Sequence, residues 1–224
     1  MQGKLKQELI EIQELLLKMS DNVLEMVSNV VHSLLLNEKK ALKSIEKFED
    51  LINDFQVKID ERSLKALALY QPTASDLRLL LGIIKLNTEL ERIGDHALNI
   101  SESVGKMSEH PAIKPLSKLQ KMADLTSKML YDSISSFKNY DLDQAKTIIL
   151  LEDKVDRLSM KLLTELKKIM VKDKSTIEPA MDLIVSTNNL QKIADHAANI
   201  AEIVIFVKQG KDVRHHSLFK LFLS

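Results

Sequence analysis

The sequence predicts an all-α protein of six long helices, arranged as duplicated three-helix bundles packed side by side. Three observations support this fold class. Apolar residues recur with a helical period along almost the whole chain, Gly and Pro are rare (five and four in 224 residues), and one polar pattern occurs twice. Helices of about 25–35 residues are well above the usual length and are stable when they pack against one another.

The first predicted helix carries a heptad seam. Its apolar residues follow one another in steps of four and three, at Leu5, Leu9, Ile12, Leu16, Met19, Val23, Met26, Val30 and Leu34. A seam of this kind requires a partner helix along its length. Asn37 is expected to end this helix.

Residues that interrupt helices mark the remaining boundaries. Breaks are expected at Pro72, at Pro111 with Pro115, at residues 139–141, at residues 172–179 and at Gly210. Thr73 or Ser75 is suited to cap the third helix, because a hydroxyl oxygen can accept from a free backbone N–H there.

The two halves of the chain repeat each other. LERIGDHALNI at 90–100 and LQKIADHAANI at 190–200 share seven of eleven residues, and FEDLIND at 48–54 resembles LEDKVDR at 151–157. The same order of elements in both halves indicates a duplicated three-helix unit. We therefore expect one repeat over residues 1–110 and a second over 111–210. The apolar tail, residues 211–224, is expected to dock on the bundle.

Carboxylates recur on the predicted helix surfaces. At about 100° per residue, Glu91, Asp95 and Glu102 share one narrow face, away from the apolar face. Like charges four residues apart destabilise a helix by a few tenths of a kcal/mol, so stability alone does not explain them. Carboxylates converging from neighbouring helices suit iron or a divalent cation such as zinc or nickel. The candidate ligands are Glu49, Glu91, Asp95, Glu152, Asp156 and Asp195, with Asp50, Glu102 and Glu202 in a second tier.

A second interpretation is that these acids form solvated helix faces. Arg92, Arg157, Lys154 and Lys192 lie close to them in the sequence and would neutralise them. Recurrence of the acids in both halves is the argument for a metal, and both interpretations stay open.

The polar signature comprises Arg92 together with His96 and Asn99, and the two latter residues recur as His196 and Asn199. Each His lies about 100° around its helix from the preceding Asp, so the two neighbours cannot form a catalytic pair. We expect the His and Asn side chains to form hydrogen bonds across the bundle or at its edge, in preference to ligating a metal.

Three glycines fall inside one predicted helix, at positions 82, 94 and 105. Each costs about 1 kcal/mol relative to Ala, which is compensated where a neighbouring helix approaches closely. We therefore expect close helix packing at all three.

Composition excludes several classes of protein. The 32 basic and 32 acidic residues balance, which argues against nucleic-acid binding through bulk charge. The lack of Cys excludes disulfides and Cys-held metal sites. Neither a signal peptide nor an apolar stretch long enough to span a bilayer is recognisable, so a cytoplasmic protein is expected. No nucleophile motif, P-loop or Glu-x-x-His pair occurs, which argues against an enzyme.

The stretch LYQPTASDLRLLLGIIKLNTELERIGDHALNISE resembles the signature of the PhoU family of phosphate-uptake regulators. LEDKVDRL and LQKIADHAANIAEIVIFVKQG resemble the equivalent segments of that family's second half. The resemblance runs from about residue 5 to residue 210.

The resemblance implies a cytosolic, non-enzymatic bundle of two three-helix repeats. It implies a negative regulator that acts as an adaptor between the ATPase subunit of the phosphate ABC transporter and the phosphate sensor histidine kinase, and a homodimer. Some family members hold iron or other metals through E(D)-x-x-x-D motifs on the bundle surface. Carried over to this sequence, the two sites comprise Glu49, position 53, Glu91 and Asp95, and Glu152, Asp156, position 191 and Asp195.

This chain departs from the family's pattern at two of those positions. Asn53 and Gln191 stand where carboxylates are expected, and each offers an oxygen without a charge. Fewer negative ligands weaken the binding of a highly charged cluster. The competing interpretations are a metal-binding helical bundle, a metal-dependent enzyme, a purely structural bundle and an accessory protein of a low-affinity phosphate permease.

Overall fold

A computed structural model describes residues 2–113 and 116–213 and confirms the predicted all-α class. Its long helices are α1 (Gln2–Leu36), α2 (Ile45–Tyr70), α3 (Ala74–Met107), α4 (Ser117–Asn139), α5 (Leu142–Lys172) and α6 (Ile177–Gln209). Two short 3-10 helices, Lys40–Ser44 and Lys174–Thr176, precede α2 and α6. Strands are absent from the described part of the chain.

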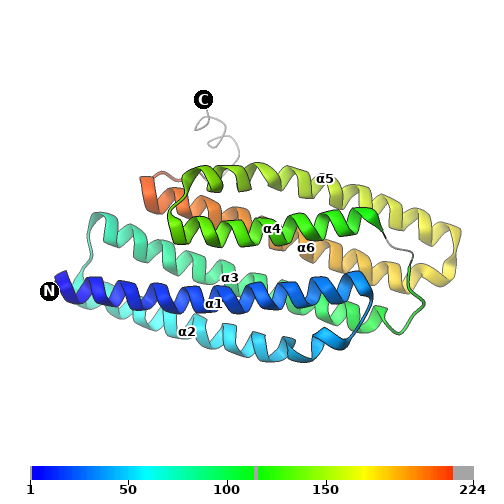
Figure 1. The fold of residues 1–224 in the computed structure, drawn as a ribbon, viewed down its shortest axis with the longest axis horizontal. Coiled ribbons are helices and arrows are strands. Elements are labelled where there is room, and N and C mark those ends of the chain that lie inside the picture. The colour runs from blue at the N-terminus through cyan, green and yellow to red at the C-terminus, as the bar shows by residue number, and fades with distance from the viewer. Residues whose placement is uncertain (1, 114–115, 214–224) are drawn as a thin grey trace.

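The helices form two groups of three that lie side by side (Figure 1). α1, α2 and α3 pack against one another, and so do α4, α5 and α6. The two groups meet mainly through α3 and α6, with a smaller contact between α1 and α4. The helices that carry the repeated polar signature are therefore the two that join the halves.

The heptad seam of α1 is buried along its full length. All nine predicted seam residues are at most 7% exposed, because α1 packs against both α2 and α3. The predicted core face of α3 is likewise confirmed, with Leu90, Ile93, Ala97, Ile100 and Val104 completely buried. Removing these side chains from water drives the packing of each three-helix group.

The predicted helix ends agree with the backbone. α1, α4 and α6 end before Asn37, Tyr140 and Gly210, which have φ angles of 53°, 53° and 70°. This left-handed conformation stops a helix and favours Gly or Asn. Asp141 then caps α5, its carboxylate accepting from the backbone N–H groups of Asp143 and Gln144.

Two boundary details differ from expectation. Thr73 occupies the N-cap position of α3, but its side chain makes no capping hydrogen bond. Pro179 does not precede α6 but lies in its first turn, where its missing N–H would have no helical partner.

The close helix approach predicted at the three glycines of α3 is confirmed at two of them. A Cβ at Gly82 would lie 2.2 Å from Cγ2 of Val207, so α6 reaches the α3 backbone there. At Gly94 the nearest atom, Cδ1 of Ile52 on α2, would be 3.3 Å away. The prediction is wrong for Gly105, where no atom would lie within 4 Å because no neighbouring helix covers that position.

The tail prediction is only partly accessible to the structure. Asp212 is exposed and Val213 is 3% exposed, while residues 214–224 lie outside the described residues. The repeat boundaries at 110 and 210 stay predictions. Among the described helices, none is both long and apolar enough to cross a bilayer.

Candidate functional site

A polar contact at the centre of the α3–α6 interface joins the two halves. Nδ1 of His196 lies 2.7 Å from Oε2 of Glu89, and Nδ2 of Asn199 donates to the same oxygen at 2.9 Å. The side chains of His196 and Glu89 are 11% and 16% exposed. The contact shields a carboxylate and an imidazole from most of the solvent.

The duplication places a second, neutral version of this contact nearby. Nδ1 of His96 lies 2.9 Å from Oδ1 of Asn189, and Asn99 donates to that oxygen at 3.5 Å. Asn189 occupies the position in α6 that Glu89 occupies in α3, 100 residues apart. The predicted hydrogen bonds of His and Asn across the bundle are therefore confirmed, and they are reciprocal.

The two imidazole rings stack between these contacts, with their centres 5.3 Å apart and their planes at 25°. Nδ2 of Asn189 donates to the Val185 carbonyl, so its Oδ1 faces His96 as an acceptor and Nδ1 of His96 carries a proton. We call Glu89, His96, Asn189 and His196, with Asn99 and Asn199, the α3–α6 polar seam.

Electrostatics make the seam asymmetric. Burial raises the pKa of Glu89, but the hydrogen bonds from His196 and Asn199 together outweigh burial and hold that pKa below its usual value. Burial lowers the pKa of His96, the hydrogen bond with Asn189 opposes this, and nearby His196 adds to the lowering. The first contact therefore contains an ionised carboxylate, whereas the second is built around neutral groups.

Glu89 and Asn189 were missed by the sequence analysis. They differ from each other, so they are not among the identical residues of the repeat. Each lies seven residues, two helical turns, before a signature His and therefore on the same helix face. Comparing the residues seven positions before each signature His in the two halves, which are 100 residues apart, could have identified them.

The first half carries an acidic surface on α2 and α3, made of Glu49, Asp50, Glu91, Asp95 and Glu102. Partial burial, then repulsion by Asp95 and Asp50, raises the pKa of Glu49. Burial and repulsion by Asp95 likewise raise the pKa of Glu91. We call these five carboxylates the first acidic surface. Among residues 2–113 and 116–213, no Lys or Arg forms a salt bridge with any of them. Asn53, also expected here, is exposed on α2.

On the equivalent surface of the second half, two of the predicted ligands already have side-chain partners. Gln191 donates to Asp156 at 2.7 Å, and Lys192 forms a salt bridge of 2.9 Å with Asp195. The hydrogen bond to Asp195 raises the pKa of Lys192, and nearby Asp156 and Glu152 add to this. A side-chain amide and a side-chain ammonium thus already engage two of the predicted ligands, Asp156 and Asp195.

The donor geometry does not fit a metal cluster. In the described part of the chain, no three His, Asp or Glu side chains lie close enough together to hold a metal ion. The carboxylates predicted as ligands share a surface without converging on a common point. Metal binding stays a prediction, and no step of the argument below depends on it.

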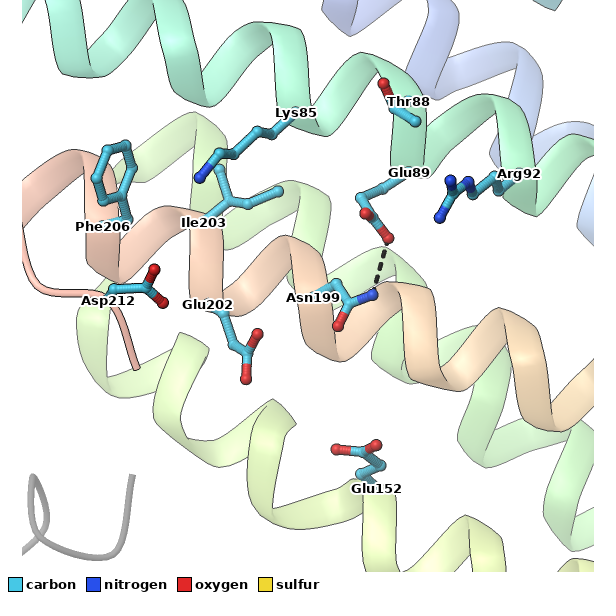
Figure 2. A pocket seen from close by; sticks show the side chains of 10 residues that line it. All are labelled: Lys85, Thr88, Glu89, Arg92, Glu152, Asn199, Glu202, Ile203, Phe206 and Asp212. Carbon is cyan, nitrogen blue, oxygen red and sulfur yellow. Dashed lines mark hydrogen bonds between the residues drawn. The ribbon is translucent and has the colours of Figure 1, made fainter. Parts of the chain in front are cut away.

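A pocket of about 600 Å³ lies over the seam, between α3, α5, α6 and the segment after α6 (Figure 2). Glu89 and Asn199 of the seam line it. Its other lining residues are Lys85, Thr88, Arg92, Glu152, Glu202, Ile203, Phe206 and Asp212. Nζ of Lys85 sits 4.6 Å from the centre of the Phe206 ring. Arg92, from the predicted signature, therefore lines the pocket, as does Glu202 from the second tier of candidates.

These features define a helical-bundle protein built from two similar three-helix units, joined by a reciprocal polar seam and acidic on its outer helix faces. The PhoU domain matches the chain at residues 16–104 and again at residues 119–204, once in each half. The chain belongs to the PhoU family.

Curated relatives resemble the chain over nearly its whole length. It is 35% identical over 215 residues to a phosphate-specific transport system accessory protein PhoU homolog of Aquifex aeolicus, covering 96% of this chain and 97% of that protein. The homolog of Pseudomonas aeruginosa is 32% identical over 215 residues, covering 96% and 89%.

Solved structures share the fold. The crystal structure of PhoU from Pseudomonas aeruginosa superposes with a TM-score of 0.88 at 30% identity, covering 92% of this chain and 99% of that one. The phosphate transport system regulatory protein PhoU from Streptococcus pneumoniae superposes with a TM-score of 0.86 at 27% identity, covering 94% and 100%.

Proposed function

We propose that this chain is a non-enzymatic, cytoplasmic negative regulator of phosphate uptake and phosphate-responsive signalling. It acts as an adaptor between the ATPase subunit of the phosphate ABC transporter and the phosphate sensor histidine kinase, and it works as a homodimer. A role in phosphate transport is supported by relatives named as accessory proteins of phosphate-specific transport systems.

The observation that carries the adaptor role is the first acidic surface. Burial raises the pKa of Glu49 and of Glu91, and repulsion by the neighbouring carboxylates adds to this effect. A basic patch on a partner would relieve the repulsion on binding. Complementary charge also speeds diffusional encounter and disfavours wrong partners, which suits an adaptor that must find two targets.

The second half differs in a way that supports two separate docking surfaces. There Asp156 already accepts a hydrogen bond from Gln191 and Asp195 already pairs with Lys192, so a basic patch would gain less from binding these two acids. We infer that the ATPase subunit and the kinase use different halves. The more basic of the two partner surfaces would bind the first half.

The test is a binding titration with the purified ATPase subunit and, separately, the kinase domain, at low and at high salt. Glu49→Gln, Asp95→Asn and Glu102→Gln together should weaken one of the two complexes about tenfold at low salt, or about 1.4 kcal/mol. High salt should reduce the difference, because screening weakens surface charge interactions.

A matched control removes the same charge elsewhere. Glu14→Gln, Asp21→Asn and Glu25→Gln neutralise three exposed carboxylates of α1. Equal losses in both triple variants would show only a net-charge effect. Absence of binding to both partners at low salt would contradict the adaptor role itself, and sedimentation equilibrium of the free protein tests the homodimer.

A further inference from the structure

Helix α5 carries a basic face on the outside of the second half. The helix packs against α4 and α6 and runs along one edge of the molecule (Figure 1). At about 100° per residue, eight of its exposed residues fall within about 120° of one another around the helix. Five are bases, Lys154, Arg157, Lys161, Lys168 and Lys172, and the other three are Met160, Thr164 and Val171. We call these eight residues the α5 basic face.

The charges of the α5 basic face are not compensated by the described part of the chain. None of its five bases forms a salt bridge with a residue in 2–113 or 116–213. The nearest acids on α5, namely Asp153, Asp156 and Glu165, each already have another partner. Like charges three and four residues apart destabilise a helix, so stability of the fold does not explain this arrangement.

Two large apolar side chains lie among these charges. Met160 is 70% exposed and Val171 is 80% exposed. A groove of about 560 Å³ between α4 and α5 adjoins them, and Lys161, Thr164 and Lys168 line it together with Met160. Exposed apolar side chains combined with a row of bases on one helix face are typical of a helix that lies on a membrane surface.

The residue types of the α5 basic face favour a lipid surface over another protein. Four of its five bases are Lys, which is depleted at protein interfaces, and the face holds none of the aromatic residues that anchor such interfaces. A lysine imposes no fixed geometry on its partner, and its methylene stem can lie along apolar surface while the ammonium reaches a phosphate. The five bases extend over about 27 Å of helix, which suits an array of negative headgroups.

We propose that the α5 basic face binds the surface of a membrane that contains anionic phospholipids. Its bases contact the headgroup phosphates, and Met160 and Val171 enter the boundary between headgroups and acyl chains. Helix α2, which carries part of the first acidic surface, lies along the opposite edge of the molecule (Figure 1). Anionic lipid repels those acids and attracts the bases of α5, so both effects favour the same orientation. This inference does not depend on the adaptor role.

Vesicle flotation of the purified full chain tests the proposal. The chain should float with vesicles of equal parts phosphatidylglycerol and phosphatidylcholine, but not with vesicles of phosphatidylcholine alone. Lys161→Gln, Lys168→Gln and Lys172→Gln together should lower the partition coefficient at least about tenfold, because each base near an anionic surface strengthens binding. High salt should weaken binding of the parent chain, because it screens these charges.

A matched control removes the same charge from the other half. Lys18→Gln, Lys47→Gln and Lys65→Gln neutralise three exposed lysines of α1 and α2, and this variant should lose less than about threefold. Equal losses in the two triple variants would show a response to net charge alone and would overturn the proposal. Circular dichroism and thermal unfolding of each variant, compared with the parent, establish that the fold is retained.

The orientation on the vesicle can be measured separately, because the chain contains no Cys. An environment-sensitive fluorophore attached through Thr164→Cys should shift to shorter wavelength when the vesicles are added. The same fluorophore attached through Asn53→Cys, which is exposed on α2, should not shift. Met160→Ser with Val171→Ser should lower the partition coefficient severalfold without changing the net charge. Equal shifts at positions 53 and 164 would contradict the assignment to α5.

An acidic protein is the other kind of partner that a basic face can bind. If the parent chain does not float with anionic vesicles, while the α5 triple variant alone loses binding to the ATPase subunit or to the kinase domain, the face binds a protein and the proposal is wrong. Equal flotation with both kinds of vesicle would also contradict it, since anionic lipid would then not be what the face recognises.

Discussion

At the scale of single residues, Glu89 is the distinctive feature of the molecule. A carboxylate that is 16% exposed is costly unless it is paired, and here a His and an Asn from the other half both donate to one of its oxygens. The pseudo-equivalent Asn189 needs no such compensation because it carries no charge. The seam therefore depends on Glu89 more than on Asn189.

Replacing Glu89 should destabilise the fold. Glu89→Ala leaves the donors of His196 and Asn199 without their acceptor, and we expect a loss of about 2–3 kcal/mol in the free energy of unfolding. Glu89→Gln retains an acceptor oxygen and should lose less. Urea unfolding measures both, with Glu61→Ala on the exposed side of α2 as the control, expected to stay within about 0.5 kcal/mol. A Glu89→Ala effect no larger than that control would mean that the seam adds nothing to stability.

Removing a carboxylate from the first acidic surface should stabilise the fold, in contrast to removing Glu89. Because burial and like charges raise the pKa of Glu49 in the folded state, its ionised form is disfavoured there, and it lowers stability above that pKa. Glu49→Gln should therefore stabilise the protein at pH 7 by a few tenths of a kcal/mol.

The pH dependence provides the check. As pH falls through the raised pKa of Glu49, the folded protein is protonated there first, so the gain from Glu49→Gln should fade in this range and be absent below the ordinary Glu pKa of about 4. Thermal unfolding of both proteins between pH 3 and pH 8 measures this. A gain of the same size at both ends of the range would show that charge repulsion is not its cause.

At the scale of elements, α3 is the central helix of the molecule, since it packs against α1, α2 and α6. The glycines of α3 show how closely the neighbouring helices approach its backbone. Gly82 lies against Val207 of α6, whereas Gly105 has open space around it. Glycine is therefore required for close packing at position 82 but not at position 105.

Substituting the two glycines should give opposite results. Gly82→Ala inserts a methyl group where Val207 already stands, and overpacking costs about 1–3 kcal/mol, more than the gain in helix propensity. Gly105→Ala meets no neighbour and should be neutral or stabilise by up to about 1 kcal/mol. Thermal unfolding of the pair tests this, and a Gly82→Ala protein as stable as Gly105→Ala would show that α6 yields easily at that point.

The elements could be predicted from the sequence because their signals are local. The heptad seam of α1 and the apolar face of α3 appear as spacings of three and four, and a helix converts such spacings directly into a buried face. The prediction for Gly105 was wrong because it depended on whether a second helix covers that position. The spacing of residues along α3 does not show where a neighbouring helix ends.

The site was harder to predict than the fold. The two histidines of the seam, Asn99 and Asn199 were found by repetition, but Glu89 and Asn189 were missed because they differ between the halves. Whether carboxylates converge depends on how each helix is rotated and on which side chains compete for the space. Lys192 and Gln191 take up Asp195 and Asp156, and only the packed structure shows this.

At the scale of the whole molecule, two similar halves meet along α3 and α6, and their outer surfaces differ in charge compensation. The first half presents repelling carboxylates, and the second presents carboxylates already bound to an amide and an ammonium. Duplication thus supplied one architecture twice, and substitution made the copies electrostatically distinct.

Metal content is a property of the whole molecule and has a direct test. Because no three donors gather among the described residues, we expect less than one ion per chain after the protein is exposed to iron and zinc and desalted. Elemental analysis measures this. Two or more ions, lost when Glu91 and Asp95 are changed together with Glu152 and Asp156, would show that the side chains rearrange around a metal.

The two halves carry different residues at one pair of equivalent positions, Glu89 and Asn189, and this difference has a geometric consequence. A perfectly duplicated bundle would look the same after a half-turn about the axis between α3 and α6, and a single partner could bind it in two orientations. The charge of Glu89, together with the different outer surfaces of the two halves, removes this ambiguity. A partner with a complementary charge distribution can therefore bind the molecule in only one of the two orientations.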